Sequence, residues 1–160
     1  MFKSKVEEWN SENSKPGETG HIQILNMIDL TSEYIKSKGY KVVGKMSTTG
    51  TRQQRLYRDP LEKAGIRVVE AKDQAAIHDA IYNPVDGIKA LSATSPRVRK
   101  IMEEAVKELR VQGAECLILG CTELPIAIPE MTLYDVDMID PMEVLARALI
   151  QNASPLKLKK

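Results

Sequence analysis

The stretch GAECLILGCTELP at residues 113–125 is an apolar run that ends in a polar cluster. Its centre, AECLILG at 114–120, has the continuous apolar character of a strand that is buried on both faces of a parallel sheet. The cluster CTE at 121–123 begins where this apolar character stops. The stretch therefore predicts a central strand of an α/β fold, with polar side chains at its carboxyl end.

A long amphipathic helix is expected immediately before this strand. Ser95 followed by Pro96 is typical of a helix start, and Gly113 is suited to ending the helix. The apolar residues between them recur at the i, i+3, i+4 and i+7 spacing of one helix face. They are Val98, Ile101, Met102, Ala105, Val106 and Leu109.

Further upstream, two short apolar runs predict a βαβ unit. The runs are KVVGKM at 41–46 and IRVVE at 66–70, and a helical pattern at 53–64 lies between them. Pro60 interrupts that pattern, because proline removes a helical hydrogen bond and clashes with the preceding turn at a cost of about 3 kcal/mol. The helix is therefore expected to kink or to form two pieces before Gly65 closes it.

Two more helices are expected from their capping residues. Thr31 is predicted to cap a helix that runs to Lys38, and Gly39 can adopt the left-handed conformation that ends it. Asp73 is predicted to cap a helix that runs to about Tyr82. The segment that follows, NPVDGIKALSAT, has few periodic apolar positions and is expected to be a loop.

The carboxyl-terminal part predicts a strand followed by a helix. YDVDMID at 134–140 supplies the strand. Asp140 is expected to cap the helix, with Pro141 at its first position and Glu143 completing a capping box. From Ile22 onward, the alternation of strands and helices predicts an α/β domain with a mainly parallel sheet.

The composition disfavours several classes of protein. The chain has 160 residues, of which 42% are hydrophobic, so one domain can bury a core without metals or disulfides. Its 23 basic residues balance 22 acidic ones without forming a basic stripe, which disfavours nucleic-acid binding. No apolar run approaches the roughly 20 residues that span a bilayer. A cytoplasmic protein that does not enter a membrane is expected.

The two cysteines, Cys116 and Cys121, are expected to be free thiols. Their spacing matches no metal site, so no metal is expected, and it would close only a very short disulfide loop. Unpaired cysteine is among the most buried residue types, which fits Cys116 within its strand. From the residues alone burial is favoured for both, but Cys121 follows the strand and has polar neighbours, so it is the better of the two candidates for a reactive thiol.

Two polar clusters are expected at one edge of the sheet. Ligands of open parallel sheets bind beyond the carboxyl ends of the strands, where STTGT at 47–51 and CTE at 121–123 are predicted to lie. The hydroxyls of STTGT and the N–H groups of the following helix would suit a carboxylate or phosphate, but the local sequence by itself favours a plain helix cap. Lys89 and His78 are ordinarily surface residues, but Lys89 lies in a loop that could carry function.

At GCTELP, residues 120–125, the sequence resembles the second cysteine motif of the aspartate/glutamate racemase family, whose members are cofactor-independent amino-acid racemases. Other segments resemble the family in its order and approximate spacing, so that the resemblance covers about residues 22–150. They are ILNMIDLT at 24–31, STTGT at 47–51, LYRDPLEKAGI at 56–66, HDAIYNPVDGIKA at 78–90 and GAECLILGCTELPIAIPE at 113–130.

The resemblance implies a three-layer α/β sandwich with a mainly parallel sheet, made of one complete racemase domain and the carboxyl-terminal part of the other. Residues 1–21 would be a polar remnant or appendage, 22–130 the racemase-like domain, and 131–153 a strand and helix that return to the incomplete domain. Residues 154–160 would form a basic tail. An apolar surface or sheet edge is then expected to be exposed, and a homo-oligomer or a complementary chain would cover it.

The resemblance also implies the chemistry of an isomerase that uses neither pyridoxal nor a metal. In the family, two cysteines flank the α-carbon of aspartate or glutamate, and one removes its proton while the other returns one. Two groups are needed because a single rigid base would mostly restore the original hand. The base must be a thiolate, so nearby donors or helix N-termini are expected to lower its pKa.

Carried over residue by residue, the resemblance makes Cys121 one acid/base catalyst. Thr122 and the STTGT loop would hold the substrate's α-carboxylate, and Lys89 would approach a carboxylate. Glu123 would orient or tune groups beside the thiol, and it favours aspartate or a broad specificity, because glutamate-specific relatives often have histidine there. The expected substrate-binding residues are Thr48, Thr49, Gly50, Thr51, Lys89, Thr122 and Glu123.

The sequence departs from the family at its front, because no CNT-type motif precedes residues 24–31. The second catalytic cysteine is therefore absent, and the isolated chain is expected to be an impaired racemase. Cys116 cannot replace it, because it shares a strand with Cys121. The alternative is a catalytically silent carboxylate-binding or interaction module. A thiol redox protein is disfavoured, because no resolving cysteine lies at a CxxC spacing.

Overall fold

A five-stranded sheet forms the centre of the computed structural model, which describes residues 2–13 and 23–157. Its strands run in the order β2-β1-β3-β5-β4. All neighbouring strands pair in parallel except β4 and β5, which are antiparallel. The strands are β1 (Val42–Ser47), β2 (Arg67–Glu70), β3 (Cys116–Gly120), β4 (Thr132–Leu133) and β5 (Val136–Ile139). The predicted mainly parallel sheet is confirmed.

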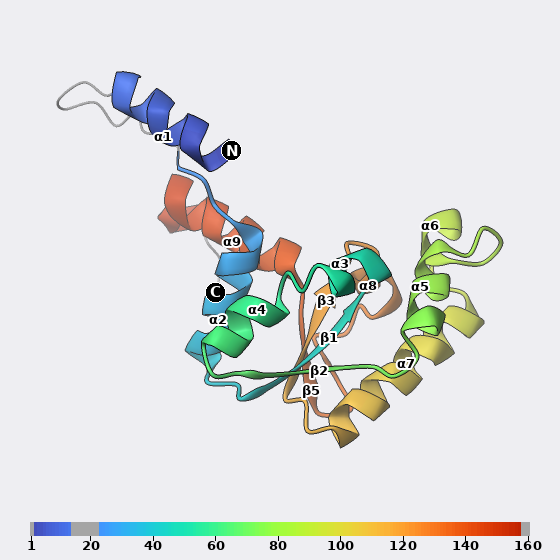
Figure 1. Cartoon of the computed structure of the whole chain (residues 1–160). Coiled ribbons are helices and arrows are strands. Elements are labelled where there is room, and N and C mark those ends of the chain that lie inside the picture. Colours follow the sequence, from blue (N-terminus) through green and yellow to red (C-terminus); the bar gives the residue numbers. More distant parts are fainter. Residues whose placement is uncertain (1, 14–22, 158–160) are drawn as a thin grey trace.

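Helices cover both faces of this sheet, which confirms the three-layer α/β sandwich (Figure 1). One core cluster packs the sheet against α5, α7 and α8. The second cluster packs the other face against α2 and α4, with α9 beside them. These helices are α2 (Met27–Lys38), α4 (Arg58–Lys63), α5 (Gln74–Tyr82), α7 (Pro96–Val111), α8 (Leu124–Ala127) and α9 (Pro141–Ala153).

Helix α7 forms as its sequence predicts. The Ser95 hydroxyl accepts a hydrogen bond from the Val98 N–H at 3.2 Å, and Pro96 occupies the first turn, where a missing N–H costs nothing. The face at helical spacing is buried against the sheet. Its buried members are Val98, Met102, Ala105, Val106 and Leu109.

Helix α2 begins four residues before the predicted start. Asn26 caps it, because its side-chain oxygen accepts from the Ile28 N–H at 2.9 Å. Thr31 is therefore not a cap; it is buried within the helix, where its hydroxyl donates to the Met27 carbonyl at 2.7 Å. Gly39 ends the helix in the left-handed conformation, with φ of 81°, as predicted.

The predicted break in the helix at 53–64 is confirmed, but its position differs. Helix α3 (Thr49–Gln53) begins inside STTGT, and the chain then turns through Arg55, whose φ is 53°, before α4 starts. Pro60 is the third residue of α4. The first turn of a helix has free N–H groups in any case, so proline is tolerated there and the break precedes it.

Asp73 caps α5 as predicted, since its carboxylate accepts from the Ala76 N–H at 2.8 Å. The predicted loop after α5 contains a short helix that the sequence analysis missed, α6 (Ile88–Leu91). The preceding Gly87 packs against the Asn83 backbone so closely that an added Cβ would lie 2.5 Å from the Asn83 carbonyl oxygen. Glycine is therefore required at this turn.

The predicted strand at 134–140 is shorter than expected. Tyr134 and Asp135 have positive φ values of 53° and 58°, and they form the turn between β4 and β5. Asp140 caps α9 as predicted, accepting from the Met142 N–H at 2.8 Å. The capping box is wrong, because the Glu143 carboxylate instead accepts from Arg147 at 2.8 Å.

The two ends of the chain contain α1 (Phe2–Asn13) and the short 3₁₀ helix η1 (Pro155–Lys157). Figure 1 shows α1 apart from the sheet, beyond α9. The predicted appendage at 1–21 and tail at 154–160 lie partly outside the described residues. The proposed division at residues 22–130 and 131–153 remains a prediction. None of the helices in the described ranges is long and apolar enough to cross a membrane.

An exposed apolar surface was expected and is present on α9. Pro141 is the helix's one buried residue, whereas Met142, Leu149 and Ile150 are exposed. The helix is amphipathic and packs against α2. Part of its apolar side therefore remains in contact with solvent.

Candidate functional site

The two predicted polar clusters begin side by side at the carboxyl edge of the sheet. Ser47, the last residue of β1, pairs in register with Gly120, the last residue of β3. A Cβ atom on Gly120 would lie 3.1 Å from the Met46 carbonyl oxygen and 3.1 Å from the Ser47 Cβ atom, so glycine permits this close approach. Helices α3 and α8 follow at the same edge (Figure 1).

The Cys121 thiol is half-buried and makes a hydrogen bond to a carboxylate. Its Sγ donates to Oε2 of Glu123 at 2.8 Å, and the Thr122 hydroxyl donates to the same oxygen at 3.1 Å. The other oxygen, Oε1, lies 3.3 Å from Nζ of Lys89. The structure therefore joins the predicted residues Cys121, Thr122, Glu123 and Lys89 in one cluster.

The electrostatics of this cluster keep the proton on sulfur. Burial, followed by the side-chain hydrogen bond and the charge of Glu123, raises the pKa of Cys121 to about 11, against smaller opposing effects of the Glu123 backbone and of Lys89. Burial also raises the pKa of Glu123, but hydrogen bonds from Cys121, Thr122 and Lys89 outweigh it and lower that pKa overall. The expectation of a lowered thiol pKa is wrong for the ligand-free site, because the thiol is buried and its hydrogen-bond partner is an anion.

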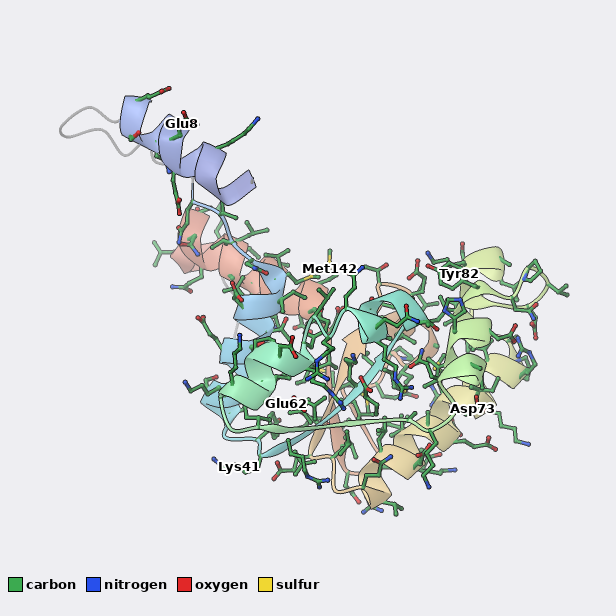
Figure 2. The ribbon with its side chains drawn as sticks, viewed as in Figure 1. Glu8, Lys41, Glu62, Asp73, Tyr82 and Met142 are labelled. Carbon is green, nitrogen blue, oxygen red and sulfur yellow. The ribbon has the colours of Figure 1, made fainter. Side chains whose placement is uncertain are left out.

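Lys89 is held by an aromatic pair on α5. Its Nζ lies 4.5 Å from the centre of the Tyr82 ring and 3.4 Å from the Tyr82 hydroxyl. The His78 ring stacks on Tyr82 with their centres 4.8 Å apart. Figure 2 shows Tyr82 at the end of α5, beside the carboxyl edge of the sheet.

The STTGT loop is a helix cap in this structure. The Thr48 hydroxyl accepts from the Thr51 N–H at 3.4 Å, as the capping alternative predicts. The Thr49 N–H donates to Nδ1 of His78 at 3.4 Å, and Gly50 is exposed. His78 is therefore a half-buried link between STTGT and the Lys89 platform, which the sequence analysis missed. Its i, i+4 spacing to Tyr82 on a helix was the available signal.

A small cavity of about 90 Å³ opens beside the thiol. Side chains from β3, from the turn before α4 and from the start of α9 line it. The lining residues are Met27, Tyr57, Leu119, Gly120, Cys121, Thr122, Asp140, Pro141 and Met142. Figure 2 shows Met142 at the start of α9, beside this edge. Neither STTGT nor Lys89 reaches the wall of this cavity.

The sequence of the chain matches the family described as Asp/Glu/Hydantoin racemase over residues 18–149. This match covers most of the chain. The chain belongs to that family.

Individual relatives agree with this assignment. Glutamate racemase from Pseudomonas entomophila is 35% identical over 111 residues, which are 68% of this chain and 40% of that protein. The aspartate racemase structure from Picrophilus torridus matches with a TM-score of 0.66 at 32% identity, covering 81% of this chain and 52% of that one. A putative Asp/Glu racemase from Yersinia pestis matches with a TM-score of 0.70 at 29% identity, covering 82% and 56%. The chain thus spans about half the length of these racemases.

The other cysteine of this family member cannot take part in the site. Cys116 lies within β3, with 0% of its surface exposed, in the core cluster beneath α2 and α4. Burial, assisted by the charges of Asp137 and Glu115, raises its pKa to about 12. Among the residues that the structure describes, no three His, Cys, Asp or Glu side chains converge to hold a metal ion.

Proposed function

We propose that this chain carries one acid/base half of an amino-acid racemase site, in which Cys121 removes or returns the α-proton of aspartate or glutamate. The contact between the Cys121 Sγ and the Glu123 carboxylate, at 2.8 Å beside a cavity at the carboxyl edge of the sheet, carries this proposal. Membership of the racemase family supports it. No cofactor or metal is part of the proposal.

The proton transfers use groups that are already in contact. The thiolate forms when the proton on Sγ moves to Oε2 of Glu123. The thiolate then takes the α-proton, so that an S–H bond forms while the C–H electron pair stays on the α-carbon beside the substrate's carboxylate. Return of the proton reverses these steps.

Substrate binding would activate the thiol through Lys89. Nζ of Lys89 is partly exposed and lies 3.3 Å from Oε1 of Glu123. When Lys89 turns toward a substrate carboxylate, Glu123 loses this cation and its affinity for a proton rises. The thiol proton then moves to Glu123 more readily. Thr122, which lines the cavity, would contact the α-carboxylate, and the STTGT residues Thr48, Thr49, Gly50 and Thr51, which do not line it, would contact the substrate beyond its head group.

Full racemisation requires a second acid/base group on the other face of the α-carbon. Cys116 is buried in the core, so a second subunit or a complementary chain would supply this group. The exposed apolar residues of α9 offer a surface for such an association. The isolated chain would exchange the α-proton without robust racemisation.

Solvent deuterium incorporation tests the proposal. The α-carbons of L- and D-aspartate and of L- and D-glutamate are followed by NMR with the wild-type chain, the Cys121→Ser variant and a Cys116→Ala control. Exchange by the wild type and the control, and its loss in Cys121→Ser, is the expected result. A wild-type chain that exchanges no α-proton contradicts the acid/base role.

A silent carboxylate-binding module is the second candidate function, and the raised pKa of the Cys121 thiol favours it. It predicts binding of aspartate without exchange. Titration of L-aspartate into ¹⁵N-labelled protein separates the two candidates, because shifts without deuterium incorporation support binding alone. Absence of both shifts and exchange rules out both functions.

A further inference from the structure

Tyr57 lines the cavity beside the thiol with a hydroxyl that has no protein partner among the described residues but is not sealed from solvent. The residue lies just before α4, has 2% of its surface exposed, and lines the Cys121 cavity. No residue in the described part of the chain makes a hydrogen bond with its hydroxyl. Burial, and then the charge of Asp140, raises the pKa of Tyr57 to about 12, so the hydroxyl stays a donor at neutral pH. The hydroxyl is not among the fully buried polar atoms that lack a partner, so it opens onto the cavity, where a bound ligand can accept its hydrogen bond in place of water.

Asp140 presents a carboxylate to the same cavity. One oxygen, Oδ1, accepts from the Met142 N–H as the cap of α9. Within the described ranges, no lysine, arginine or histidine forms an ion pair with Asp140, and Oδ2 has no hydrogen-bond donor. The half-buried wall of the cavity therefore carries an unpaired negative charge, which would attract a cationic group.

An α-amino acid matches this arrangement. Its ammonium and carboxylate groups are bonded to the α-carbon, whose proton would leave. The α-carbon and both of these groups must therefore lie close to the thiol. The cavity offers one donor hydroxyl, one free carboxylate oxygen and one thiol. The STTGT residues do not line it. The head of the amino acid therefore finds its partners on residues that the family motifs quoted above do not assign.

We propose that Tyr57 and Asp140 bind the head group of the substrate, with the Tyr57 hydroxyl donating to the α-carboxylate and the Asp140 carboxylate accepting from the α-ammonium group. This inference rests on the proposed function, which places the α-carbon of the substrate beside Cys121. It concerns binding alone, so it can be tested without measuring turnover. Asp140 makes the site select amino acids over dicarboxylates that lack the amine. Tyr57 and Asp140 are thus substrate-binding residues for this chain.

The Tyr57→Phe variant tests the hydroxyl, with Tyr40→Phe as the matched control. The Tyr40 hydroxyl also lies on the folded chain, but it donates to Asp137 at 2.5 Å and does not line the cavity. We expect Tyr57→Phe to melt no lower than wild type and to bind L-aspartate about tenfold more weakly, the loss typical of one hydrogen bond. Tyr40→Phe is expected to melt at a lower temperature with unchanged binding. A Tyr57→Phe variant with wild-type affinity overturns this role.

The Asp140→Asn variant tests the charge while keeping the helix cap, because asparagine caps as well as aspartate. Affinities for L-aspartate and for succinate, which lacks the amine, are measured by NMR titration. The wild-type chain is expected to bind aspartate about tenfold to a hundredfold more tightly than succinate, the difference typical of a hydrogen bond between charged groups. The Asp140→Asn variant is expected to lose this preference. Glu143→Gln, on the same helix turn but outside the cavity, is the control and should keep it.

The outcomes separate this inference from the proposed function. Aspartate binding that depends on Tyr57 and Asp140, without α-proton exchange, supports the head-group site and contradicts catalysis. Exchange at wild-type rate and wild-type affinity in both variants supports catalysis and overturns the head-group site. Absence of aspartate binding by the wild-type chain also overturns the head-group site.

Discussion

Cys116 and Cys121 lie at opposite ends of one strand segment and occupy opposite environments. Cys116 begins β3, pairs across the sheet with Val43 and Asp137, and has no exposed surface. Cys121 follows the last residue of the same strand and is half-buried. Its thiol donates to the Glu123 carboxylate, which in turn pairs with the Lys89 ammonium group. Both thiols have a raised pKa, but of the two only Cys121 is partly exposed to solvent.

This difference shows that the end of a parallel strand, rather than the residue type, creates a site. Within β3, the backbone groups and side chains are used in pairing and packing. Beyond Gly120 the pairing stops, and side chains from α6 and α9 approach residues 121–123. At the neighbouring strand end, the Ser47 carbonyl likewise accepts a hydrogen bond from a side chain of another element, that of Gln74 on α5.

Thiol alkylation at pH 9 is the largest expected contrast between the two cysteines. Iodoacetamide should modify Cys121 in the native chain, whereas Cys116 must wait for unfolding. A domain with a free energy of unfolding of about 5 kcal/mol opens so rarely that Cys116 should react at least about a thousandfold more slowly. Peptide mass spectrometry over time measures both rates. Similar rates would show that the β3 core opens locally.

Serine substitutions give a smaller contrast in stability. Cys116→Ser places a hydroxyl in an apolar cluster without a partner and should cost about 1–3 kcal/mol. Cys121→Ser can keep the hydrogen bond to Glu123 and should change the free energy of unfolding by about 0.5 kcal/mol or less. Urea unfolding followed by circular dichroism measures both. Equal losses would mean that Cys121 is as much a core residue as Cys116.

Neutralising the neighbours of Cys121 should shift its pKa in opposite directions. The Glu123 anion raises the pKa of the thiol and Lys89 lowers it. The pKa of Cys121 should therefore fall below about 11 in Glu123→Gln and rise above the wild-type value in Lys89→Met. More thiolate at a given pH means faster alkylation, so at pH 9 Glu123→Gln should react several-fold faster and Lys89→Met more slowly. Glu104→Gln, an exposed change on α7, is the control. Shifts of the same sign would contradict the charge assignment.

Several elements followed directly from local patterns. Ser95 with Pro96 begins α7, Asp73 begins α5 and Asp140 begins α9, because a cap forms hydrogen bonds within three residues of itself. The apolar run at 114–120 contains the central strand β3, because a strand that is buried on both faces of the sheet needs apolar side chains at successive positions.

The errors arose where two local choices competed. Asn26 and Thr31 are both good caps, and the earlier one is used because Ile28 and Ile35 then pack on the sheet. Helix α6 has one turn and too few apolar positions to show a period, and Gly87 places it through contact with Asn83. Neither result follows from the spacing of residues along the chain.

The candidate site was predicted in part. Cys121, Thr122, Glu123 and Lys89 meet as the family resemblance implied, although their substrate roles remain predictions. The sequence analysis did not predict that Tyr57 and Asp140 line the cavity beside Cys121. Asp140 follows the carboxyl end of β5, just as Ser47 and Cys121 follow their strands, so its position was a usable signal. Tyr57 had no such signal, because it reaches the cavity from a turn.

The sequence by itself determined the α/β class, the main strands and most of the helix starts, because these depend on apolar period and on caps a few residues long. It also identified Cys121, since a polar residue at the end of a buried strand is recognisable locally. Tertiary structure alone decided the partners of that thiol. The Glu123 carboxylate accepts from it, Lys89 of α6 pairs with Glu123, and Asp140, which follows β5, lines the same cavity. Only folding buries the thiol beside these groups, and burial together with the Glu123 carboxylate keeps the proton on sulfur.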